Sequence, residues 1–91
     1  MLPAIPFWMR QRQIKVEPIN DTAVALKTPN LPTHELVLRP SGNGDGIIAA
    51  IYCLPAAGEA KFLVAEKPSG VTEPQVAWQF AFELFRQKVI V

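Results

Sequence analysis

Proline spacing is the feature of this sequence that most restricts its fold. The 91-residue chain contains nine prolines, and six of them separate short apolar runs: Pro18, Pro29, Pro32, Pro40, Pro55 and Pro68. Proline is poorly tolerated inside a helix and cannot donate a hydrogen bond inside a sheet, so it tends to mark the ends of elements. The short runs between these prolines are therefore predicted to be strands rather than helices.

Strands are predicted throughout residues 12–66. The five segments are residues 12–17, 22–28, 34–39, 47–54 and 61–66. In the first segment Ile14 and Val16 alternate with Lys15 and Glu17, which is typical of a strand with one buried face. Because the connections between segments are short, we expect the strands to follow one another in an antiparallel, meander-like sheet.

Residues 73–88 are predicted to form a helix. Thr72 and Gln75 have the spacing of a capping box, and Val71 and Val76 have the spacing of a hydrophobic staple. The fold class expected is α+β, with an antiparallel sheet of about five short strands followed by one C-terminal amphipathic helix packed on the sheet. A chain of this length makes a single domain, residues 1–91, and residues 1–9 form an apolar N-terminal arm.

The glycine-rich stretch SGNGDG, residues 41–46, is predicted to be a hairpin loop. A calcium loop of the EF-hand type needs an acidic or amide ligand at its first position and a glutamate at its twelfth, where this sequence has Ser41 and Tyr52. A phosphate-binding glycine loop needs a third glycine where Ile47 stands, and a helix after it. Asn-Gly and Asp-Gly pairs instead favour the positive φ angles of a hairpin turn, so neither a metal nor a phosphate ligand is expected here.

The nucleophiles and bases of the chain do not form a recognisable catalytic motif. His34 is the only histidine and Cys53 the only cysteine, and their spacing from the acidic residues matches no zinc site. His34 is expected to lie on the surface, and Cys53 to pack as a small hydrophobe. A Cys–His pair across the hairpin stays open as an alternative, but the sequence predicts a protein that is not an enzyme and has no cofactor.

A basic and aromatic segment near the N-terminus gives one alternative function. Trp8, Arg10, Arg12 and Lys15 are the residue types of a single-stranded nucleic-acid platform, with the arginines on one face of a strand. The other interpretation is a solvated edge strand whose charges discourage aggregation. The net charge of +1 gives no general attraction to phosphate, so the second interpretation is preferred.

The apolar surface exceeds what one helix and one sheet need. The apolar arc of the helix spans about 200°, twice the ~100° typical of a helix with one buried face. Trp78, Phe82 and Phe85 occupy one flank of that arc, and Phe82 lies nearest the polar stripe, so this flank is predicted to contact a partner. The strands at residues 34–39, 47–54 and 61–66 are also apolar on both faces. We expect this surface to be covered either by the N-terminal arm or by a partner.

The function predicted is therefore association, either with a second copy of the chain as a homodimer or with another protein as a subunit of a larger assembly. A weaker option is a small-molecule carrier with a pocket between helix and sheet. One cysteine allows no internal disulfide, which favours a reducing compartment, and no apolar run approaches the ~20 residues of a membrane helix. A cytoplasmic protein without membrane contact is expected.

Overall fold

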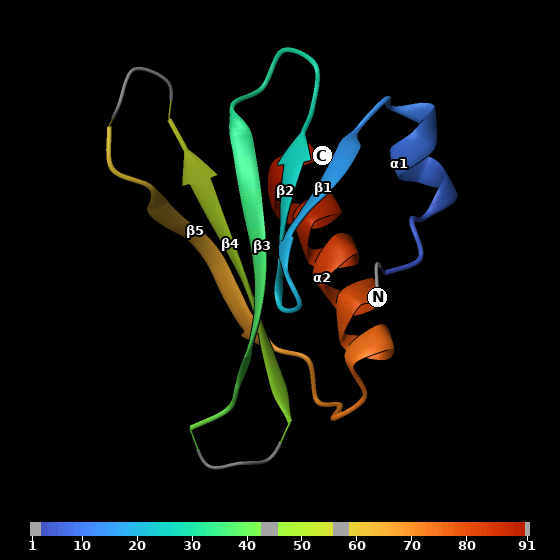
Figure 1. The fold of residues 1–91 in the computed structure, drawn as a ribbon, viewed down its shortest axis with the longest axis vertical. Helices are drawn as coiled ribbons and strands as arrows, with labels where there is room; N and C mark the ends of the chain where they lie inside the picture. The colour runs from blue at the N-terminus through green and yellow to red at the C-terminus, as the bar shows by residue number, and fades with distance from the viewer. Residues whose placement is uncertain (1–2, 43–45, 56–58, 91) are drawn as a thin grey trace.

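The computed structural model describes residues 3–42, 46–55 and 59–90, and it has the predicted α+β architecture. In chain order the elements are α1 (Phe7–Gln11), β1 (Lys15–Asn20), β2 (Ala23–Lys27), β3 (Thr33–Pro40), β4 (Ile47–Leu54), β5 (Phe62–Pro68), α2 (Pro74–Phe85) and a short π-helix, η1 (Arg86–Ile90). The strands form one antiparallel sheet in the order β1-β2-β3-β4-β5, which confirms the predicted meander. Figure 1 shows both α-helices on one side of this sheet, with β5 at the opposite margin of the view.

The pairing register assigns each side chain to one of two sheet faces. Val24, Leu36, Ile51 and Ala65 lie opposite one another across four strands, and all four belong to the core or pack against it. Directly opposed residues share a face, so this row and its alternate neighbours form the face that α2 covers. The residues between them, including Glu35 and Tyr52, form the other face, which is called the open face below.

The core lies between α2 and this first face. The helix packs mainly over β4 and β3, and its small residues Ala77 and Ala81 are fully buried at that contact. Alanines let a helix backbone approach a sheet closely, so the larger side chains of the helix project to either side of the contact. Phe82, Phe85, Leu36 and Ile51 are each 0% exposed in the resulting cluster.

The N-terminal arm packs beside α2 instead of crossing the open face. The last three residues of the predicted arm and the two residues after it form the short helix α1. Met9 from this helix is fully buried in the core. Gln79 donates a hydrogen bond from Nε2 to the Ala4 carbonyl oxygen at 2.9 Å. Arg86 lies 5.5 Å above the ring of Trp8. The arm therefore closes one flank of α2.

Three local predictions near element ends are wrong. The first strand begins at Lys15 rather than at residue 12, because the preceding turn ends α1 through Gln13, which has a φ of 59°. The predicted capping box does not form, since Glu73 is the N-cap of α2 and no side chain caps it. Instead, the segment before the helix is tied to the sheet, as Ile47 N–H donates to the Val71 carbonyl oxygen at 3.0 Å. The predicted helix over residues 73–88 is α-helical only to Phe85 and continues as the π-helix.

Candidate association surface

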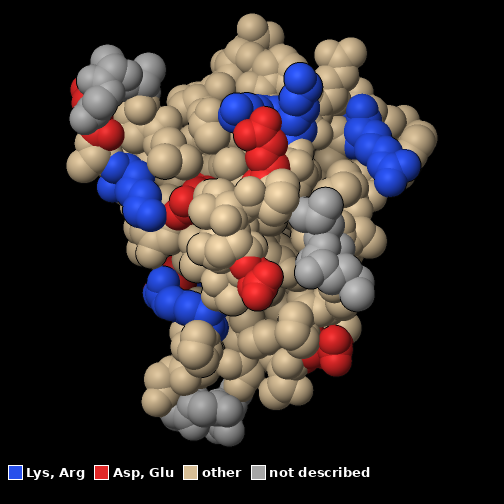
Figure 2. All heavy atoms as spheres, in the orientation of Figure 1, with Lys and Arg blue, Asp and Glu red and all other residues tan. Residues whose placement is uncertain are grey.

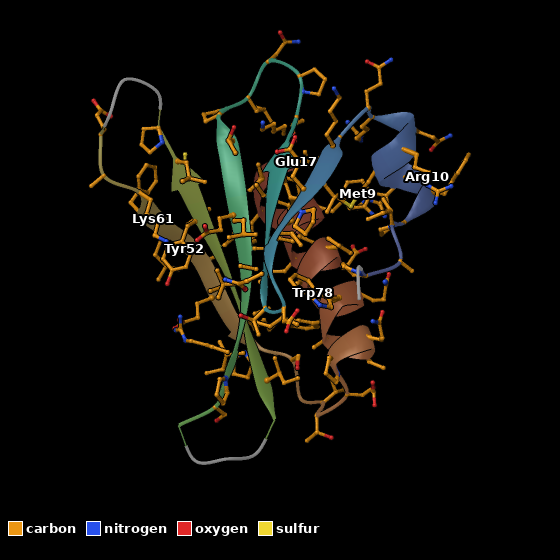
Figure 3. All side chains as sticks on the ribbon, in the orientation of Figure 1. Met9, Arg10, Glu17, Tyr52, Lys61 and Trp78 are labelled. Carbon is orange, nitrogen blue, oxygen red and sulfur yellow. The ribbon has the colours of Figure 1, made fainter. Side chains whose placement is uncertain are left out.

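The open face of the sheet is covered by its own charged side chains. Lys61 Nζ lies 2.9 Å from a carboxylate oxygen of Glu35 and 5.1 Å from the centre of the Tyr52 ring. Arg39 forms an ion pair with Glu66 and donates a hydrogen bond to the Tyr52 hydroxyl at 3.3 Å. The hydrogen bond and the charge of Glu35 raise the pKa of Lys61. Lys61 and Tyr52 lie side by side in Figure 3.

This cluster explains why the open face needs no second layer. Ala50 is fully buried and Ala23 nearly so, although no helix lies over them. Long charged side chains cover small residues with their methylene groups while their charged ends stay in water. Basic and acidic side chains lie interspersed on the side of the molecule seen in Figure 2. The N-terminal arm, one of the covers expected for this face, packs beside α2 instead, and cover by a partner stays a prediction.

The β1 edge of the sheet is protected against further pairing. Pro18 lacks a backbone N–H, and the pairing with β2 is irregular between Pro18 and Asn20. Glu17 and Lys27 form an exposed ion pair at 3.2 Å beside this edge. Proline, bulges and charges are the devices by which natural sheets block pairing at an edge. A partner strand is not favoured at this edge.

The β5 edge, in contrast, exposes a continuous apolar run. Phe62, Leu63 and Val64 are 54%, 49% and 37% exposed. In the described ranges the other exposed large hydrophobic residues stand apart from one another in the sequence: Phe7, Ile19, Leu31 and Val76. Because α2 packs mainly over β4 and β3, the helix leaves β5 largely uncovered.

The run occupies both faces of the edge strand. Leu63 lies opposite Tyr52 and so belongs to the open face, whereas Phe62 lies opposite Cys53 and belongs to the helix side. The pairing shifts between Ile51 and Tyr52, which leaves Val64 without a partner in β4. The signal for this surface was present in the sequence: residues 61–66 were predicted to be apolar on both faces and to form the last strand of a meander, which is an edge.

The aromatic flank predicted to contact a partner lies in the core of the chain. Trp78, Phe82 and Phe85 are 3%, 0% and 0% exposed. The rings of Trp78 and Phe82 stack with centres 6.0 Å apart. The prediction that Phe82 is the one of the three that does not belong to the core is wrong. The wide apolar arc of α2 is covered by the sheet on one part and by the N-terminal arm on another. These three residues are not available as a surface for a partner.

The basic segment does not form the predicted strand face. Arg10 and Arg12 are exposed, but they belong to α1 and to its C-terminal cap, while Lys15 begins β1. Trp8 packs against the core and beneath Arg86. Figure 3 shows Arg10 directed away from the sheet and Met9 directed toward it. The four residues therefore do not share one flat surface on which bases could stack.

His34 is buried, contrary to the surface position expected for it. It is 5% exposed, its ring meets the Phe85 ring edge-on with centres 5.4 Å apart, and its Nδ1 lies 2.9 Å from the Pro32 carbonyl oxygen. Burial lowers the pKa of His34. Cys53 is buried opposite it in β4, as expected for a small hydrophobe. The packing of both residues against the helix layer gives them little access to a substrate.

Two shallow clefts flank the β1–β2 turn. One, of about 380 Å³, is lined by Pro3, Pro18, Ile19, Asn20, Asp21, Val24 and Trp78. The other, of about 370 Å³, is lined by Asp21, Thr22, Leu38, Arg39, Pro40, Gly46, Ile47 and Pro74. The first lies between Trp78 of α2 and Val24 of β2, but both clefts are open to solvent, so neither is the enclosed pocket that a small-molecule carrier requires.

The hairpin between β3 and β4 is closed by a hydrogen bond from Ser41 N–H to the Gly46 carbonyl oxygen at 3.0 Å, while residues 43–45 of the predicted loop lie outside the described residues. Within residues 3–42, 46–55 and 59–90, no three His, Cys, Asp or Glu side chains gather as metal ligands. None of the helices in these ranges has the length and apolar character needed to span a bilayer.

Comparison with known protein families, with curated proteins and with solved structures finds no match to this chain.

Proposed function

We propose that this protein acts by association, through addition of a partner strand to the β5 edge. The observation that carries the proposal is the exposed run Phe62, Leu63 and Val64 on an edge strand that the helix does not cover. An edge strand presents a row of unpaired backbone N–H and C=O groups, and an added strand satisfies these groups while it buries the side chains on either face. No catalytic step is part of the proposal.

The difference between the two edges supports this choice. One edge combines a proline, an irregular register and an ion pair, all of which disfavour pairing. The other edge carries apolar side chains on both faces, so a partner strand gains side-chain contacts as well as backbone hydrogen bonds. Burying a half-exposed leucine or phenylalanine contributes on the order of 1 kcal/mol. Specific association is therefore proposed at β5 and not at β1.

Site-specific photo-crosslinking tests the proposal. Benzoylphenylalanine in place of Leu63 is expected to give covalent adducts in the extract of the native host. The same group in place of Ile19 is the matched control, since Ile19 is 50% exposed and lies in the opposite edge strand, against 49% for Leu63. Adducts formed from position 63 and not from position 19 support association at β5. Equal labelling from both positions, or from neither, contradicts it.

The expected cytoplasmic location remains part of this proposal and rests on the single cysteine alone. The nucleic-acid alternative is not carried forward, because Trp8 is engaged by the core and by Arg86.

A further inference from the structure

We propose that the strand added to β5 is the β5 strand of a second copy of this chain, paired antiparallel, so that two sheets join into one continuous sheet. This inference rests on the proposed function and names its partner. Antiparallel pairing of two identical edges has two-fold symmetry, with the axis perpendicular to the sheet. Under that symmetry each hydrogen bond made by one copy is repeated by the other. The β5 edge therefore needs to be complementary only to a second copy of itself.

The charges along β5 favour an antiparallel copy. Lys61 precedes the apolar run, and Glu66 follows it. Both belong to the open face, because Lys61 bonds to Glu35 and Glu66 lies opposite Ala50. An antiparallel copy places the start of one run beside the end of the other, which brings Lys61 of each chain toward Glu66 of its partner. A parallel copy would turn its sheet over, so that the charged residues of the two chains would lie on opposite faces and could not pair.

The same arrangement extends the ion pairs within each chain. Lys61 already contacts Glu35, and Glu66 already contacts Arg39. Across the two-fold axis these pairs form one alternating row: Glu35 and Lys61 from one copy, then Glu66 and Arg39 from the other. The net charge of +1 adds little repulsion between copies. The apolar run then lies at the centre of the interface, where its side chains meet those of the second copy on each face.

The area of the interface limits the affinity of the dimer. Pairing along one seven-residue strand involves less surface than the ~800 Å² per partner of a standard stable interface. We therefore expect a dimer that dissociates on dilution through the micromolar range, rather than a permanent assembly.

A charge-exchange experiment tests the partner and its direction together. Each of two variants, Lys61→Glu and Glu66→Lys, places like charges opposite one another at both ends of the interface in its own homodimer. Mixed one to one, they place opposite charges together at both ends. Each chain loses one internal ion pair whether it is mixed or not, so a comparison of mixed with separate samples cancels that loss.

The readout is sedimentation equilibrium of the purified chains over a dilution series. Each variant alone is expected to dimerise at least about tenfold more weakly than the wild type, and the mixture is expected to recover the difference. Lys27→Glu mixed with Glu17→Lys is the control, since this exposed pair lies at the β1 edge and its exchange is expected to leave the mass unchanged.

The outcomes distinguish this inference from the proposed function. Recovery in the mixture supports the antiparallel homodimer. A mixture as weak as its components, or a wild type that remains monomeric throughout the series, overturns it. If the purified wild type is monomeric while position 63 still crosslinks another protein in the extract, the edge is used but its partner is not a second copy. If position 63 also fails to crosslink, both proposals are overturned.

Discussion

His34 and Cys53 lie directly opposite each other in β3 and β4, both buried on the face that α2 covers. The His34 ring packs edge-on against Phe85, and its Nδ1–H donates to the Pro32 carbonyl oxygen. The only imidazole of the chain is therefore part of the packing where α2 passes into the π-helix. This position gives it a role in stability that a surface histidine does not have.

Stability is expected to fall as the pH decreases through the range in which histidine titrates. Burial lowers the pKa of His34 below its ordinary value of 6.5, so the folded chain holds this side chain neutral at pH values where the unfolded chain protonates it. The unfolded state then binds more protons, and the free energy of unfolding rises with pH. The full contribution is present above about pH 6.5 and is lost as the pH falls below it. Urea unfolding at pH 7.0, 6.5, 6.0 and 5.5 measures this slope.

His34→Gln is the control for that slope. This variant has no imidazole, so its free energy of unfolding should vary less between pH 5.5 and 7.0 than that of the wild type, whatever its absolute stability. An unchanged slope in His34→Gln would assign the pH dependence to other groups and sink the prediction.

Phe82→Ala is expected to destabilise the fold and not merely to alter association. Phe82 is fully buried beside Trp78, and truncating a buried phenylalanine costs about 3–5 kcal/mol. Val76→Ala on the same helix is the matched control, since Val76 is 50% exposed and its truncation should change the free energy of unfolding by less than about 1 kcal/mol. Equilibrium urea unfolding compares the two. Similar losses for both variants would contradict the placement of Phe82 in the core.

The sequence allowed the fold class and the strand order to be predicted, because proline spacing and alternation are local signals. The buried flank of α2 was misassigned, since the width of an apolar arc does not reveal how many elements pack around the helix. Met9 and Trp8 of α1 cover the part of α2 that the sheet does not reach. The sequence around them was interpreted as an apolar arm followed by a strand, so this helix was missed. The cover of the open face was also missed, because Glu35 and Lys61 are distant in sequence and meet only across paired strands.

Gly46→Ala is expected to be destabilising at the end of the β3–β4 connection. Gly46 has a φ of 112°, and an added Cβ would lie 3.0 Å from the Val71 carbonyl oxygen, which already accepts from Ile47 N–H. Residues other than glycine adopt such backbone angles at a cost of order 1–3 kcal/mol. Gly42→Ala is the control, because an added Cβ there meets no atom within 4 Å. A melting temperature lowered equally by both changes would refute the specific role of Gly46.

The basic segment is expected not to bind single-stranded DNA or RNA at physiological ionic strength. Arg10 and Arg12 are exposed, but the aromatic residue beside them is engaged by the core. Fluorescence anisotropy with labelled oligonucleotides tests this at two salt concentrations. Micromolar binding that weakens with salt and is lost in the Arg10→Ala/Arg12→Ala variant would restore the nucleic-acid alternative, since phosphate contacts give such a salt dependence.

The solution mass of three chains across a dilution series tests the central claim, association of two copies of the chain through β5, most directly. Wild type and Ile19→Lys should both shift from monomer to dimer as concentration rises through the micromolar range, while Leu63→Lys should remain monomeric and folded. Leu63 and Ile19 are almost equally exposed, 49% and 50%, so a general effect of an added lysine would appear in both variants. A wild type that stays monomeric at every concentration, or a Leu63→Lys chain that dimerises as well as the wild type, would contradict the account.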